Sequence, residues 1–179
     1  MSHLDANALV LRLERRPEAI VMLVRQFTRA GVAWRPTDAS GQPEGWSVTQ
    51  ILAHLADEEV EDFRPRLLST LRDPAEPWLP IDPENAAIER NYQDVPIEKS
   101  LDRYVRERQE SVRLLKGLRQ PDWALVHMAQ WGPIMAGDLL ASWVAHDILH
   151  MRQIVKRMHQ LARLDSGDYS TSYAGEWKG

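Results

Sequence analysis

Apolar residues recur every three or four positions through most of the chain, which is the period of an amphipathic α-helix. This pattern predicts a first helix from about Asp5 to Arg29. We expect Pro17 to restart it, because proline suits the first turn of a helix. Glycine, serine and proline over residues 31–45 predict a loop. Strand-like alternation is scarce, so the pattern favours an all-α protein.

The second predicted helix has the clearest start in the sequence. Ser47 is followed three residues later by Gln50, a pattern typical of a capping box, and apolar residues continue at helical spacing as far as Leu67. Pro65 lies inside this stretch. Because proline removes one backbone hydrogen bond, we expect it to kink the helix.

Two more helices follow proline-rich or turn-rich chain. Residues 73–96 contain five prolines and predict a long crossover, with a short helix near Glu84–Asn91. The third helix should open at Asp94–Pro96 and continue to about Leu118. A turn-rich stretch then precedes a fourth helix, which is expected over about 136–162. The predicted fold is therefore a four-helix bundle, an up-and-down variant with a long crossover between its second and third helices.

Length and composition agree with one ordinary globular domain. The 179 residues are 44% apolar and 27% charged, and we expect the bundle to occupy residues 1–163 with an irregular tail at 164–179. A net charge of −4 argues against a nucleic-acid partner. No apolar run approaches the ~18 residues that span a bilayer, and no signal peptide is evident, so we expect no membrane partner. The absence of cysteine excludes thiolate ligands and fits a cytoplasmic protein.

Three histidines are the candidate metal ligands. His146 and His150 lie four residues apart on an apolar stripe, so their rings share one helical face and can reach a common point. His54 lies between apolar residues of the second helix and should also point inward. Three imidazoles on one divalent ion would leave a coordination position open, as in catalytic sites. The alternative is a set of buried histidines that hydrogen-bond to carbonyl or carboxylate groups.

Charged residues near these histidines are candidates for catalysis. Glu58 lies one helical turn after His54 and Glu61 nearly two turns after it, so either carboxylate could orient an imidazole or accept a proton. A solvated acidic face is the alternative. Arg108 falls on the core stripe of the third helix. It could hold an anionic group of a substrate or pair with an acid of the run DEEVED, and the sequence leaves both open.

Other residues carry weaker signals. Asp147 is expected to face away from the histidine pair, and His127, in a predicted loop, could reach the mouth of the bundle. Trp46, Trp131 and Trp143 are expected to wall the core or a pocket. The run HDILH is similar to the H-E-x-x-H helix of zinc proteases. Aspartate replaces its catalytic glutamate, however, which disfavours that function.

Two segments carry a resemblance to a known family. GWSVTQILAHLADEE and WGPIMAGDLLASWVAHDILHMRQI, with roughly ninety residues between their histidines, resemble the DinB/YfiT-like superfamily of metal-binding four-helix bundles. The resemblance extends from about Leu13 to Arg157 and includes the crossover. One departure is Met135, where relatives tend to have a capping threonine, so we expect the first turn of the fourth helix to fray.

The resemblance implies a function as well as a fold. It implies that His54, His146 and His150 hold a divalent nickel, zinc or iron ion with water, and that the protein is a homodimer. The favoured hypothesis is a metal-dependent enzyme that activates a water or a thiol, acting as a hydrolase or as an S-transferase with a small-molecule substrate. A low-molecular-weight thiol such as bacillithiol or mycothiol would then be a cosubstrate. The alternative is a non-catalytic, metal-stabilised bundle that serves a dimeric, stress-related interaction.

Overall fold

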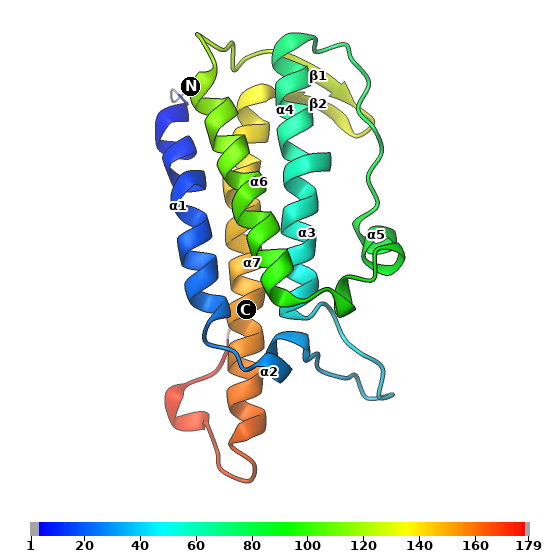
Figure 1. The fold of residues 1–179 in the computed structure, drawn as a ribbon, viewed down its shortest axis with the longest axis vertical. Coiled ribbons are helices and arrows are strands. Elements are labelled where there is room, and N and C mark those ends of the chain that lie inside the picture. The colour runs from blue at the N-terminus through cyan, green and yellow to red at the C-terminus, as the bar shows by residue number, and fades with distance from the viewer. Residues whose placement is uncertain (1–3, 178–179) are drawn as a thin grey trace.

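Four long helical segments form the bundle of this computed structural model, which describes residues 4–177 (Figure 1). Residues 1–3 and 178–179, the outer ends of the expected domain and tail, lie outside the described residues. The long segments are α1 (Ala6–Val24), α3 (Val48–Glu61) continued by α4 (Phe63–Arg72), α6 (Ile97–Gly117) and α7 (Ala136–Asp165). The short elements are α2 (Arg29–Ala33), α5 (Pro83–Glu89), the 3-10 turns η1 (Tyr92–Asp94) and η2 (Ser172–Ala174), and the strands β1 (Val126–Ala129) and β2 (Gly132–Met135). The prediction of a four-helix bundle is confirmed.

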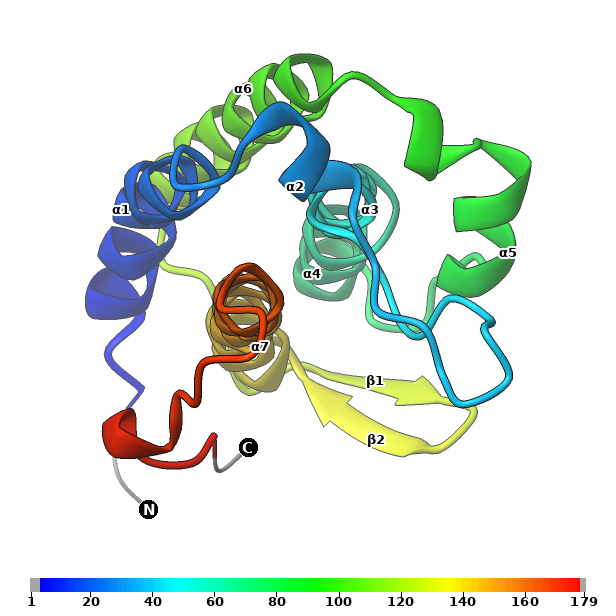
Figure 2. The same ribbon diagram turned by 90° about the horizontal axis from the view of Figure 1, so that it is seen from below.

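The crossover determines how the helices are arranged. Figure 1 shows α1 and α7 descending, whereas α3, α4 and α6 ascend. Residues 73–96 carry the chain back along the outside of the bundle through α5, so α6 runs parallel to α3 (Figure 2). Each of α1 and α3 packs against α6 and α7. The first two long helices in the sequence, α1 and α3, therefore lie diagonally opposite each other.

Both interior prolines act differently from the prediction. Pro17 does not restart α1 but lies within it, and the carbonyl of Leu13, which its missing N–H leaves free, accepts a hydrogen bond from Arg108 Nη1 at 3.4 Å. The expected kink lies three residues before Pro65, because α3 ends at Glu61 and Asp62 is not helical. Pro65 thus occupies the first turn of α4, where its missing N–H would have no partner in the helix.

The connection into the fourth helix contains a hairpin that the pattern did not predict. β1 pairs with β2 in antiparallel register, with Val126 opposite Met135 and a two-residue turn between the strands. The hairpin leads directly into α7. The backbone N–H groups of Ala136 and Gly137 donate to the carbonyls of Leu125 and Trp123, both at 2.9 Å. The expected fraying of this turn is not supported, because tertiary hydrogen bonds take the place of a threonine cap.

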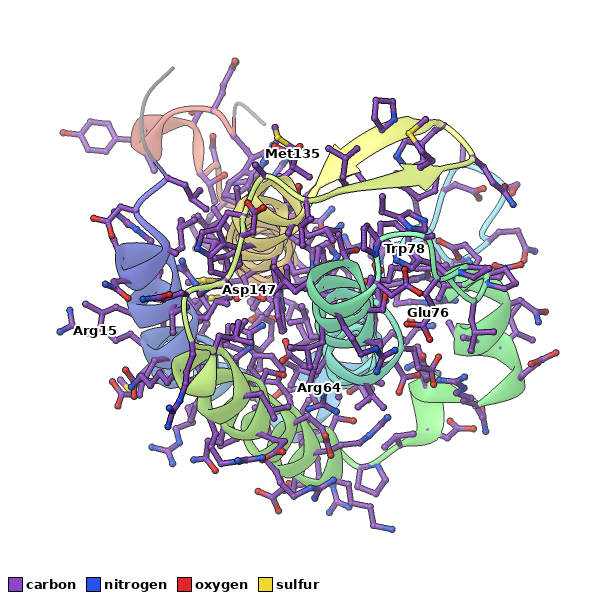
Figure 3. The ribbon with its side chains drawn as sticks, turned by 90° about the horizontal axis from the view of Figure 1, so that it is seen from above. Arg15, Arg64, Glu76, Trp78, Met135 and Asp147 are labelled. Atoms are coloured by element: carbon purple, nitrogen blue, oxygen red, sulfur yellow. The ribbon has the colours of Figure 1, made fainter. Side chains whose placement is uncertain are left out.

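A buried layer of charge divides the core. One apolar cluster fills the end where α7 begins, and another fills the end where α3 begins. Between them Arg108, Glu59 and Asp147 are almost completely buried and paired with one another. Viewed from above, Asp147 lies in the interior, whereas Arg15 projects outward from α1 (Figure 3). In the described part of the chain no helix is long and apolar enough to cross a membrane.

Candidate metal centre

Helices α3 and α7 pack side by side and bring the three histidines together. The Ser47–Gln50 capping box starts α3 as predicted, and nearly every side chain from Val48 to Glu59 is buried. His54, 5% exposed, therefore faces the contact with α7. His146 and His150 face it from the other side, one turn apart. The ligand atoms of the three imidazoles lie within 4.8 Å of one another.

The distances within the cluster suit a shared ion. His146 Nε2 and His150 Nε2 are 3.0 Å apart. The ring centroid of His54 lies 4.7 Å from that of His150 and 5.4 Å from that of His146. Two nitrogens that are each about 2.0–2.1 Å from one metal, at angles of about 90–109°, are roughly 2.9–3.4 Å apart. The donor set and its spacing therefore fit a divalent cation.

A hydrogen bond orients one of the rings. His150 Nδ1 bonds to Gln153 Oε1 at 2.8 Å, which makes Nδ1 the N–H and directs the Nε2 lone pair toward His146 Nε2. His54 Nδ1 lies 3.5 Å from Glu58 Oε1. The buried Nδ1 of His146 has no hydrogen-bond partner among the described residues. This combination of outer partners and inward nitrogens is typical of imidazoles that bind a metal.

Aromatic side chains enclose the centre. Trp46 presents its ring to His54 edge-on at 4.8 Å and stacks parallel to His150 at 6.5 Å between centroids. The ring centroid of Phe63, in the first turn of α4, lies 5.0 Å from that of His146. These contacts lower the polarity around the imidazoles and restrict the access of water.

Burial lowers the pKa of all three imidazoles. Loss of hydration is the largest cause for each. The neighbouring rings add to it for His54 and His146, whereas Gln153 and Asp147 oppose it for His150. The pKa of His54 falls from 6.5 to about 2, and that of His146 to about 3. The cluster is therefore neutral at physiological pH. Neutral imidazole is the form that binds a metal.

Glu58 is the candidate catalytic carboxyl group that lies at the centre. Burial, followed by a hydrogen bond to Asp62 and the charge of Asp62, raises its pKa to about 9. Asp62 is in turn paired with Arg66 at 2.7 Å. Glu58 therefore carries a proton at neutral pH while the cluster is uncharged. A cation held by the histidines would favour the ionised carboxylate.

Two other acids of the run DEEVED, Asp57 and Glu61, form ion pairs outside the metal centre. Glu61, a candidate for catalysis, is exposed and receives two hydrogen bonds from Arg90, at 2.7 and 3.0 Å. Asp57 is buried and pairs with Arg90, with the Tyr92 hydroxyl and, at 2.5 Å, with Arg103. Both carboxylates tie α3 to the crossover, and Asp57 also ties it to α6. Glu61 is thus occupied by an ion pair two turns from His54.

Arg108 is part of the core rather than of the metal centre. Its Nε and Nη2 donate to Glu59, both of its terminal nitrogens donate to Asp147, and Nη1 also donates to Leu13 O. Every N–H of the guanidinium is used, and the side chain is 1% exposed. The expectation that Arg108 holds an anionic substrate is therefore wrong, and the alternative pairing with an acid of DEEVED describes it.

Asp147 is equally committed to the core. It faces away from the histidine pair as expected, but into the bundle, where it is fully buried against Arg108. An aspartate paired in this way cannot serve as the base of a zinc-protease helix. The structure thus removes the main support for that hypothesis.

His127 lies apart from the centre. It belongs to β1, stacks on Trp78 at 3.9 Å between ring centroids, and bonds to Pro74 O through Nδ1 at 2.9 Å. Trp78 also lies beneath the guanidinium of Arg66. Of the tryptophans expected to wall the core or a pocket, Trp143 is buried in the core, whereas Trp131 is 70% exposed and lines a cleft of about 550 Å³ beside Trp78.

Sequence reasoning did not identify two residues at this centre, Gln153 and Asp62. Gln153 lies three residues after His150, a spacing that places both on one helical face and could have indicated the contact. Asp62 stands four residues after Glu58 by the same rule. A small cavity of about 180 Å³ lies between α3 and the crossover, and His54 and Glu58 form part of its wall. Solvent can enter the centre from that side.

Comparisons with known proteins agree with this description. YfiT from Bacillus subtilis, a probable metal-dependent hydrolase with an unusual four-helix bundle topology, matches with a TM-score of 0.77 at 18% identity, over 90% of each chain. At that identity the likeness shows the fold alone. No curated protein sequence matches the chain significantly. The sequence model of the DinB superfamily matches residues 12–154, most of the chain. The chain therefore belongs to the DinB superfamily.

Proposed function

We propose that this protein is a metal-dependent enzyme that activates a water or a thiol at His54, His146 and His150. The observation that carries the proposal is the convergence of three neutral imidazoles from two helices, two buried and one, His146, half-buried, with donor atoms within 4.8 Å of one another. Core histidines without a ligand would each be expected to bond to carbonyl or carboxylate groups. Here the Nε2 atoms of His146 and His150 face each other instead.

Each residue around the centre has a distinct part in the proposed reaction. The three imidazoles would hold a divalent ion, which when bound lowers the pKa of a water or thiol toward ~7. Glu58, whose proton affinity burial raises, is suited to take up the released proton on Oε1 or Oε2 and return it later. Gln153 fixes the His150 ring, and Trp46 and Phe63 limit the access of bulk water.

The reaction is either hydrolysis or transfer to a thiol. The chain has no cysteine, so any thiol must arrive with a substrate. The description of YfiT as a probable metal-dependent hydrolase supports the hydrolytic version. We keep both versions, because a bound ion with an open position serves either nucleophile. Nickel, zinc and iron are the ions that suit three imidazole ligands.

Metal analysis tests the proposed centre. We expect purified protein without added metal to carry close to one equivalent of a transition metal by elemental analysis. The variants His54→Ala and His150→Ala should carry almost none, because each removes one of three ligands. His159→Ala, on the same helix as His150 but outside the cluster, should retain the metal of the unmodified protein. Full retention by both cluster variants would contradict the proposed site.

Turnover separates the enzyme from the non-catalytic alternative. Metal-loaded protein should hydrolyse a model ester or amide, or consume a thiol, and Glu58→Gln should slow the reaction while the metal remains bound. If no substrate turns over and metal removal dissociates a dimer, the metal-stabilised interaction protein is the better description. A thiol that changes the visible spectrum of cobalt-substituted protein would favour S-transfer, and an unchanged spectrum would favour hydrolysis.

A further inference from the structure

A second, larger cleft adjoins the metal centre. It has a volume of about 710 Å³ and is lined by the loop after α2, the start of α3, the helix α5 and the helix α7. Trp46 and Gln153 form part of its wall. Trp46 contacts His54 and His150 on its other side, and Gln153 is hydrogen-bonded to His150. A ligand in this cleft would therefore be separated from two of the metal ligands by a single side chain.

Three cations line the cleft, and none of them has a carboxylate partner. Arg35, Lys156 and Arg157 have no carboxylate oxygen within 4.0 Å among residues 4–177. Arg35 donates instead to the amide oxygen of Gln50, at 3.3 Å. Two glutamates, Glu44 and Glu84, also line the cleft, but both are exposed and neither pairs with these cations.

Arg157 is the most informative of the three because it is 8% exposed. Its guanidinium donates to Trp46 O at 2.8 Å, to Glu44 O at 3.1 Å and to Gln160 Oε1 at 2.6 Å, all neutral acceptors. Burial lowers its pKa, and the charge of Glu44, which forms no ion pair with it, opposes this effect without reversing it, while the charge of Arg35 lowers the pKa further. Buried arginines are almost always paired with an anion.

The backbone is shaped to hold this guanidinium in place. Gly45 has φ of +64°, a conformation that favours glycine, and a Cβ atom there would lie 2.7 Å from Arg157 Nη2. Glycine at this position therefore avoids backbone strain and leaves room for the guanidinium, which a side chain here would displace. The two carbonyls that accept from Arg157 belong to the residues on either side of Gly45, so the loop holds the guanidinium at the cleft wall.

We infer that this cleft binds the anionic end of a small organic molecule that carries a carboxylate or a phosphate, and that Arg35, Lys156 and Arg157 recognise it. Two guanidinium groups and an ammonium group match the oxygens of either anion. The apolar side chains Pro43, Ile88 and Trp46 would contact the rest of the molecule. The role of the cleft in directing a substrate to the histidines rests on the proposed function, whereas anion binding itself does not.

Calorimetric titration of metal-loaded protein with inorganic phosphate and, separately, with succinate tests this inference. We expect saturable binding of at least one anion, and the tighter one identifies the recognised group. Arg35→Gln and Lys156→Gln should each weaken binding by about ten- to a hundredfold, as expected for a lost charge-assisted hydrogen bond. Arg157→Gln should weaken it most. If that variant fails to fold, the first two carry the test.

Control variants distinguish specific binding of the anion in the cleft from general attraction of anions to positive charge on the protein. Arg163→Gln, an exposed position further along α7, should leave the affinity unchanged. Absence of saturable binding to the unmodified protein, or equal weakening in Arg163→Gln, would overturn the inference. His54→Ala should lose metal but keep the anion. If elemental analysis finds no bound transition metal while the anion still binds, the proposed function is wrong and the inference about the anion-binding cleft is retained.

Discussion

Individual residues were predictable where the evidence for them was local. His146 and His150 share a helical face by spacing alone, and their rings do meet. The burial of Arg108 followed equally from its place on an apolar stripe. Its partners did not follow, because Glu59 and Asp147 belong to two other helices. The contact of His54 with the other histidines likewise depends on tertiary structure. The family resemblance predicted it, whereas helical periodicity could not.

The substitution Arg108→Ala should be strongly destabilising. It leaves Glu59 and Asp147 buried without a counter-charge, and removing one partner of such a pair costs about 3–5 kcal/mol. Urea unfolding should therefore show a lower free energy of unfolding by about that amount. Arg113→Ala breaks only the exposed pair with Glu110, so it should cost about 1 kcal/mol or less. Equal effects of the two substitutions would contradict the structural role given to Arg108.

At the scale of helices and strands, starts were easier to predict than ends. The capping box of α3 needs only Ser47 and Gln50, which are close in sequence, and it forms as expected. The break at Asp62 depends on how α4 packs on α7, so Pro65 indicated that a break exists without locating it. The hairpin escaped prediction because its strands are four residues long, one contains proline, and the turn lacks the usual Asn-Gly pair.

Removing the cap of α3 should weaken the whole bundle. Ser47 is fully buried. Its hydroxyl accepts from Gln50 N–H at 3.2 Å and donates to Gln93 at 3.0 Å. We expect Ser47→Ala to lower the free energy of unfolding by about 1–2 kcal/mol, as for other lost caps. Ser166→Ala, at the C-terminal end of α7, removes only a solvent-exposed hydrogen bond to Ala162 O, so it serves as the control and should change stability by no more than about 0.5 kcal/mol. A smaller effect of Ser47→Ala than of this control would contradict the expectation.

For the whole molecule, periodicity indicates how many helices there are but not which of them touch. The proline-rich crossover indicated a departure from simple hairpin connections, and it does make α6 parallel to α3. The polar layer through the core was visible only as isolated charged residues on apolar stripes. Which of those residues pair, and which surround the histidines, depends on the packing of α3, α6 and α7 around one another.

The stability of the metal-free protein should peak near pH 6.5. His54 and His146 have folded pKa values of about 2 and 3, so below about 6.5 the unfolded chain binds protons that the folded chain excludes, and stability falls as pH falls. Glu58 acts in the opposite sense. With a folded pKa of about 9, it is protonated in the folded chain but ionised in the unfolded one, so stability also falls as pH rises from 6.5 toward 9.

Urea unfolding in the presence of a chelator, repeated across this pH range, measures both effects. Each group contributes a slope of at most about 1.4 kcal/mol per pH unit. Glu58→Gln should remove the fall on the alkaline side and leave the acidic side in place. Stability that rises steadily through pH 9 in the unmodified protein would show that Glu58 does not hold its proton in the folded chain.

The diagonal placement of the first two long helices bears on how the protein is made. Apart from α4, which continues α3, the long helices against which α1 and α3 pack are α6 and α7, and both are synthesised after the middle of the chain. A nascent polypeptide that ends before α6 therefore lacks both of the long helices against which these two amphipathic helices bury apolar surface. Sequentially connected hairpins could form as they leave the ribosome, whereas here most of the chain must emerge first. Newly made chains thus expose apolar surface longer, and dependence on chaperones during synthesis follows from that topology.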